Sequence, residues 1–185
     1  MPSPMLSVLH LLDPASGFQA HRTAQQLASA AGTAMRHSLL TLPDSMLAAA
    51  ARSRTAIGRT RPDLIHAWGL SGLLAAILHR RIPLIYSPAD EPSDSEVRWL
   101  VSAARSRSFT VVCPSHAVYR RLAAAGLPPD RLRVIRCGVD FSRVRPRRDE
   151  ALRRRLGYCD EDCVILGLGE STAAADHDLA GWAVG

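Results

Sequence analysis

Residues 109–140, FTVVCPSHAVYRRLAAAGLPPDRLRVIRCGVD, carry the clearest structural pattern in the chain. The apolar run at residues 110–113 predicts a short strand that is buried on both faces. A proline ends this run, and the hydroxyl of Ser115 is placed to cap the helix that follows. Gly126 suits the left-handed position after that helix, and residues 132–135 are expected to form the next strand. The stretch therefore predicts a strand, a capped helix, a second strand and a tight turn in succession.

The same alternation of short apolar runs and helical patterns continues toward the N-terminus. A capping box formed by Ser93 and Glu96 marks the start of one helix, and Ser71 is expected to open another. Repeated strand–helix–strand units of this length require a parallel sheet with helices on both faces. We therefore predict an α/β fold, a doubly wound, Rossmann-like parallel sheet, over residues 1–145. Its strands are expected near Leu6, Leu39, Leu64, Leu84, Val111 and Val134.

The composition indicates a globular chain with an excess of arginine. The 185 residues are 47% hydrophobic and 22% charged, which suits one domain of ordinary size or one domain plus part of another. All 23 basic residues are arginines, and the net charge is +6. This charge could bind phosphates, nucleic acid or anionic lipid, but we favour compositional bias as the reason for it. Aromatic residues are not interleaved with the arginines, so we expect no nucleic-acid partner.

Targeting and redox features point to the cytoplasm. The N-terminus lacks the basic region of a signal peptide, and the longest uncharged run, residues 64–79, is shorter than the ~20 residues that a membrane span needs. The four cysteines are expected to be free thiols in a reducing compartment. Cys159 and Cys163 have the wrong spacing for a zinc site, so neither a metal nor a cofactor is expected. We expect a cytoplasmic protein whose arginines make a peripheral contact with the anionic inner face of the membrane.

Residues 109–140 resemble the signature at the end of the N-terminal domain in family 4 glycosyltransferases, which have the GT-B fold. Arg136 and Cys137 replace the Pro-Asn pair of that signature. The matching positions are Ser115, Leu122, Gly126, Arg131, Val134, Ile135, Gly138, Val139 and Asp140. The resemblance implies a retaining, hexosyltransferase-type enzyme that needs no metal. It would transfer a sugar from a nucleotide sugar to a glycan or a lipid-linked acceptor, in a cleft between two domains.

The resemblance also implies a domain organisation. Residues 1–145 would be the acceptor-side domain, and residues 146–158 a linker with a short helix. Residues 159–185 would be the truncated start of the donor-binding domain, with its first strand at residues 163–168. A chain that stops at this point is expected to be inactive by itself.

Candidate site residues follow the strands, because doubly wound sheets bind ligands beyond the carboxyl ends of their strands. His66 is expected to end the third strand, in an element similar to the family's "PDvvHaH", whose second histidine is Trp68 here. The imidazole of His66 could bond an acceptor hydroxyl or take its proton; the alternative is a buried histidine bonded to a loop carbonyl. Asp90 and Glu91 lie where relatives often carry a histidine. Asp90 could act as a base and Glu91 could bind substrate, or both could precede the capped helix at Ser93.

The remaining candidates are expected to bind substrate. Gly17 lies in the loop before the first helix, where backbone amides can receive an anion, although an ordinary strand–helix turn explains the loop as well. The family usually has Gly-Gly in this loop, and only Gly17 remains here. Ser115, Gly138 and Asp140 follow two later strands and complete the predicted cleft.

One region argues against donor chemistry. Relatives carry an arginine and a lysine that neutralise the donor's diphosphate, whereas Glu170 stands in the place of the arginine here. Asp176 and Asp178 lie near the expected lysine. The alternative function is therefore a non-catalytic Rossmann-like module that lost donor chemistry and binds a glycan, a lipid head group or a protein.

Overall fold

The computed structural model of the protein describes residues 5–15, 17–32, 34–88, 91–138 and 148–165. The chain divides into two compact units, Met1–Gly138 and Val139–Gly185, and each is described by itself.

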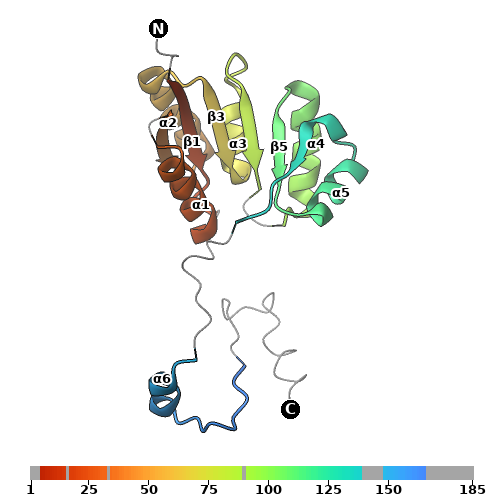
Figure 1. Cartoon of the computed structure of the whole chain (residues 1–185). Coiled ribbons are helices and arrows are strands. Elements are labelled where there is room, and N and C mark those ends of the chain that lie inside the picture. Colours follow the sequence, from red (N-terminus) through yellow and green to blue (C-terminus); the bar gives the residue numbers. More distant parts are fainter. Residues whose placement is uncertain (1–4, 16, 33, 89–90, 139–147, 166–185) are drawn as a thin grey trace. The chain divides into compact units, whose positions relative to one another are not determined.

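Unit 1 is built on a parallel sheet of six strands (Figure 1). The strands are β1 Leu6–Leu12, β2 Met35–Thr41, β3 Leu64–Trp68, β4 Leu84–Ser87, β5 Thr110–Cys113 and β6 Leu132–Val134. They lie in the order β2-β1-β3-β4-β5-β6, and every neighbouring pair is parallel. The prediction of a doubly wound parallel sheet is confirmed, as are all six predicted strand positions.

Helices connect successive strands and cover both faces of the sheet (Figure 1). They are α1 Gly17–Ala30, α2 Met46–Thr60, α3 Gly69–Ile77, α4 Asp94–Ser106 and α5 His116–Ala124, with a 3₁₀ turn at Pro129–Arg131 before β6. Neighbouring residues of a strand point to opposite faces, which separates two apolar clusters on β1. Leu11 belongs to the large cluster formed with α2, α3, α4 and α5, whereas Leu12 packs with Ala20 and Ala24 of α1. Helix α1 therefore covers one face and the other four helices cover the opposite face.

The predicted helix caps are present in α4 and α5. Ser93 accepts the backbone N–H of Glu96, and the Glu96 carboxylate accepts the Ser93 N–H, which completes the capping box. Ser115 accepts the N–H of Val118 at 3.2 Å. Gly126 follows α5 with a φ of +100°, the left-handed conformation that glycine adopts at low cost.

Helix α3 starts earlier than the sequence predicts. It begins at Gly69 and not at Ser71, and Trp68 is its N-cap residue without a side-chain cap. The reason lies outside the local sequence: the carboxylate of Asp13 accepts the N–H of Ser71 at 2.8 Å. The side chain of Asp13, which follows β1, thus caps α3 in place of the local serine that was expected to open the helix.

Unit 2 contains a short helix in its described part. Helix α6, Glu150–Arg155, is capped by Asp149, which accepts the N–H of Leu152 at 3.0 Å. This confirms the predicted short helix. The described part of the strand expected at residues 163–168, residues 163–165, is not in a strand. Within the described residues, every helix of the protein is too short or too polar to span a bilayer.

Candidate functional site

The order of the strands places the topological switch point of the sheet at the carboxyl ends of β1 and β3. The chain runs from β1 outward to β2 and then returns past β1 to β3, so the connections diverge between β1 and β3. In doubly wound sheets such a reversal is where ligands bind. Asp13 and Gly69 directly follow the two strands, and Gly17 begins α1 at the same edge. The candidate residue Gly17 therefore lies at the predicted edge, although it begins α1 and is not in the loop before it.

Asp13 is the central acidic group at this edge. Its side chain is buried, with 6% of the residue exposed. One carboxylate oxygen accepts the N–H of Ala15 at 2.9 Å and the other accepts the N–H of Ser71 at 2.8 Å. The backbone N–H of Asp13 donates to the carbonyl of Trp68 at 3.0 Å. The carboxylate lies at the positive end of α3, where a negative charge stabilises the helix.

Two glycines let α3 approach the end of β1 closely. Gly69 has a φ of +74°, and a Cβ there would lie 2.7 Å from the Cβ of Asp13. A Cβ on Gly72 would lie 2.7 Å from the carbonyl oxygen of Leu11. Distances this short exclude a side chain at either position unless the backbone moves. The glycines thus allow the contact between Asp13 and the first turn of α3.

A hydrogen-bonded row of ring side chains crosses the sheet beneath this edge. The indole N–H of Trp68 donates to Nδ1 of His10 at 3.1 Å, and Nε2 of His10 lies 2.9 Å from Nδ1 of His37. Because Nδ1 of His10 accepts, the neutral ring carries its proton on Nε2 and donates to His37. His66 stacks on Trp68 with ring centroids 4.3 Å apart, and its Nε2 lies 2.9 Å from the hydroxyl of Ser87. The row joins β2, β1, β3 and β4.

The burial of this row keeps its central imidazoles neutral. Burial, with a smaller contribution from His37, lowers the pKa of His10 to about 4. Burial lowers the pKa of His66 to about 3, with smaller contributions from His10 and His37. A group that remains uncharged far below neutral pH is a weak base, but it can still donate or accept a hydrogen bond.

The position of His66 differs from the prediction. The residue does not end β3; it lies inside the strand, paired with His10 of β1, and the strand continues to Trp68. Trp68 pairs with Leu12, and the backbone turns only at Gly69. Burial of His66 agrees with the structural alternative, but its partner is the Ser87 hydroxyl and not a loop carbonyl.

The described candidates Glu91, Ser115 and Gly138 follow the carboxyl ends of β4, β5 and β6 but differ in their contacts. The carboxylate of Glu91 pairs with the guanidinium of Arg121 at 3.2 Å, and Arg121 also pairs with Asp94 at 2.6 Å. Ser115 caps α5, and Gly138 is the last described residue before the end of unit 1. The candidates Asp90 and Asp140 lie outside the described residues, as does the region of Glu170, Asp176 and Asp178.

Four residues of the edge and the row were not predicted from the sequence as a group: Asp13, His10, His37 and Ser87. The available signal was weak. A histidine interrupts each of the apolar runs of β1, β2 and β3, and an Asp-Pro pair follows β1. Polar residues inside otherwise apolar strands suggest a buried network, but the partners are decided by the pairing of strands far apart in the sequence.

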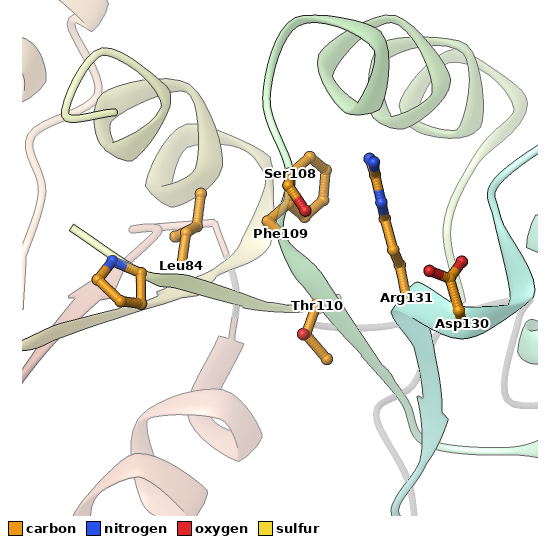
Figure 2. A pocket seen from close by; sticks show the side chains of 7 residues that line it. Leu84, Ser108, Phe109, Thr110, Asp130 and Arg131 are labelled. Carbon is orange, nitrogen blue, oxygen red and sulfur yellow. The ribbon is translucent and has the colours of Figure 1, made fainter. Parts of the chain in front are cut away.

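A pocket of about 460 Å³ lies at the opposite, amino edge of the sheet. Figure 2 shows its lining, with Leu84, Ser108 and Thr110 at the beginnings of β4 and β5 and Asp130 and Arg131 just before β6. The guanidinium of Arg131 donates to the carbonyl of Ala104 in α4 at 2.9 Å. This pocket is separate from the carboxyl edge. Among the described residues, no group of three His, Cys, Asp or Glu side chains could hold a metal ion.

The sheet order and the polar carboxyl edge define the class of the domain: a Rossmann-like domain as found in GT-B proteins. The model of Glycosyltransferase Family 4 matches residues 10–143, and the chain belongs to this family.

Solved structures with the same fold include complexes of HepE from Anabaena. The complex with UDP and glucose is 20% identical with a TM-score of 0.60, and the match covers 82% of this chain and 50% of that chain. The complex with UDP-glucose is 21% identical, again with a TM-score of 0.60, and has the same coverage. The chain therefore spans about half the length of HepE, and at this identity the likeness shows the fold. No curated protein sequence matches the chain.

Proposed function

We propose that this chain is the acceptor-side half of a retaining glycosyltransferase that uses a nucleotide sugar. The observation that carries the proposal is the family match over residues 10–143, together with a carboxyl edge at the β1–β3 reversal that bears buried polar groups. A domain of this kind positions one substrate and leaves the second substrate to a partner domain. We place residues 146–158 as the linker and residues 159–185 as the start of that domain.

The donor class follows from the structural relatives. HepE has been solved with UDP and with UDP-glucose, and this chain covers half of it. We propose a UDP-sugar as the donor, held chiefly by the second domain. The acceptor, a glycan or a lipid-linked sugar, would then lie against the carboxyl edge of unit 1.

The contacts at the edge suggest how an acceptor is held. Asp13 already accepts an N–H of the first turn of α3, so the start of α1 at Gly17 is the helix terminus that we propose for a sugar or a phosphate group. His66 has a pKa near 3, which favours hydrogen bonding over proton abstraction. Asp90 is therefore the proposed base. Glu91, Ser115, Gly138 and Asp140 complete the proposed cleft.

We also propose a cytoplasmic location with a peripheral contact to an anionic membrane. The net charge of +6 supports this location, since anionic lipid attracts basic surfaces.

The proposal is tested by transfer from labelled nucleotide sugars. A protein that joins this chain to a complete second domain should transfer sugar from a UDP-sugar to a glycan or lipid-linked acceptor, with retention of configuration. The 185-residue chain alone should show no turnover. Absence of transfer from every UDP-, GDP- and ADP-sugar in the two-domain protein, with its fold intact, would refute the proposal. Robust turnover by the chain alone would refute the assignment of donor binding to the second domain.

A further inference from the structure

A basic loop connects α3 to β4 at the amino edge of the sheet. It consists of Leu78, His79, Arg80 and Arg81, and we call these four residues the basic loop. Leu78, Arg80 and Arg81 are exposed, and Leu78 shows 70% of its surface to solvent. An exposed leucine beside two exposed arginines is the combination found in surfaces that enter a lipid head-group region.

A buried cation holds this loop in one conformation. Arg107 is 8% exposed, and its guanidinium donates to the carbonyl of Ala76 before the loop at 2.6 Å and to the carbonyl of Ile82 after it. The loop also closes on itself, because the N–H of Ile82 donates to the carbonyl of His79 at 3.1 Å. A loop that is already ordered loses little conformational entropy when it docks on a partner.

The positive charges around the loop are not compensated. Arg54 of α2 is close enough to His79 to affect its titration: burial lowers the pKa of His79, followed by the charges of Arg107 and Arg54. Arg80 acts in the same way on Arg107, whose pKa is lowered by burial and then by Arg80. In the described part of the chain, none of these arginines forms an ion pair with a carboxylate. Like charges held this close repel one another, and an anionic partner relieves the repulsion.

Of the described acidic groups of unit 1, Asp63 and Asp130 lie at the amino edge. The others, Asp13, Asp44, Glu91, Asp94 and Glu96, follow the carboxyl ends of strands or begin helices at the other edge. Basic residues near helix C-termini also complement the helix dipole, which explains part of the asymmetry. The dipole does not explain why Leu78 is exposed among these basic residues. It also does not explain why their guanidinium groups form no ion pairs within the described part of the chain.

We propose that the basic loop, together with Arg54, docks unit 1 on the surface of an anionic lipid bilayer. This assigns the membrane contact suggested by the net charge to one surface, and it does not depend on the transfer activity proposed above. Lipid is favoured over nucleic acid because the loop presents an exposed aliphatic side chain and no phenylalanine, tyrosine or tryptophan for base stacking. In this orientation the amino edge faces the lipid and the carboxyl edge stays open to solvent, which favours the glycan over the lipid-linked sugar as the acceptor.

Binding of the full chain to phospholipid vesicles tests the proposal. The chain should float with vesicles that contain about 30 mol% phosphatidylglycerol and not with pure phosphatidylcholine, and salt should release it. The triple variant Arg54→Gln, Arg80→Gln, Arg81→Gln should lose on the order of 100-fold in partition, since each basic residue at the surface contributes about fivefold. Leu78→Ser should lose about fivefold, because it removes apolar contact with the lipid.

A matched control removes the same charge elsewhere. Arg36, Arg98 and Arg120 are exposed residues of β2, α4 and α5, and their triple glutamine variant should keep at least a third of the wild-type partition. A larger loss in this control would show that net charge alone drives binding and would overturn the assignment. Wild-type binding by the loop variant, or no binding by the wild-type chain, would overturn it too. Tighter binding to a DNA duplex than to the anionic vesicles, at equal salt, would show that the loop binds nucleic acid and would overturn the proposal of a lipid ligand.

Discussion

The neutral histidine row predicts a steep loss of stability in mild acid. His10 is 1% exposed and His66 is 9% exposed, and their pKa values fall from 6.5 to about 4 and about 3 on folding. Between these values and 6.5 the unfolded chain binds protons that the folded chain does not, so folding becomes less favourable as the pH falls. The stabilisation is complete above about pH 6.5 and is lost progressively down to about pH 4 for His10 and about pH 3 for His66.

The size of the effect follows from the two titrations. A histidine that stays neutral in the folded state and titrates normally in the unfolded state costs about 2 kcal/mol between pH 7 and pH 5. Two such histidines cost about 4 kcal/mol, a large part of the 5–15 kcal/mol that roughly describes domain stability. We therefore expect the free energy of unfolding of unit 1 to fall by about 4 kcal/mol over this range.

Urea unfolding of the full chain, followed by circular dichroism at both pH values, measures this difference. His66→Gln keeps a hydrogen-bonding side chain beside Ser87 but removes one titration, so its fall should be about 2 kcal/mol. His116→Gln changes an exposed histidine of α5 and should leave the wild-type fall of about 4 kcal/mol. A wild-type fall below about 1 kcal/mol, or an equal fall in His66→Gln, would refute the neutral buried row.

Three further substitutions test the packing, each by the free energy of unfolding in urea. Gly72→Ala should destabilise unit 1 by about 2 kcal/mol, because the new Cβ meets a backbone carbonyl at 2.7 Å. The control Gly58→Ala has open space around it and should be neutral or stabilising. Equal effects of the two substitutions would contradict the close approach of α3. Arg107→Met should lower the free energy of unfolding by about 2 kcal/mol, because the charged hydrogen bonds to the carbonyls of Ala76 and Ile82 are lost. An unchanged stability would show that these hydrogen bonds contribute nothing. Ser93→Ala should cost about 1 kcal/mol by removing the cap of α4, and no loss would mean that solvent replaces the cap without cost.

The sheet could be predicted because each of its strands has a recognisable local sequence pattern. Short apolar runs bounded by proline, glycine or capping residues recur along residues 1–145, and each of the six strands predicted there was found. The caps at Ser93 and Ser115 were also predictable, since a cap involves residues only three positions apart.

The site was less predictable because its contacts join distant parts of the chain. Asp13 and Ser71 are 58 positions apart, and no local pattern shows that one caps the helix of the other. The position of His66 along β3 was predicted wrongly for a related reason. Nothing in the sequence His-Ala-Trp marks the end of the strand, and pairing with β1 and β4 carries the strand on to Trp68. The histidine row likewise depends on the register of three strands.

The most direct test of the proposed acceptor site is amide NMR of the chain during titration with short oligosaccharides. We predict that shift changes cluster at the carboxyl edge, at Asp13, Ala15, Gly17, Gly69 and Ser71, and spread toward Glu91. The amides of the basic loop and of the pocket around Arg131 should remain unchanged. Shift changes centred on the amino edge, with the carboxyl edge unaffected, would contradict a sugar site at the β1–β3 reversal.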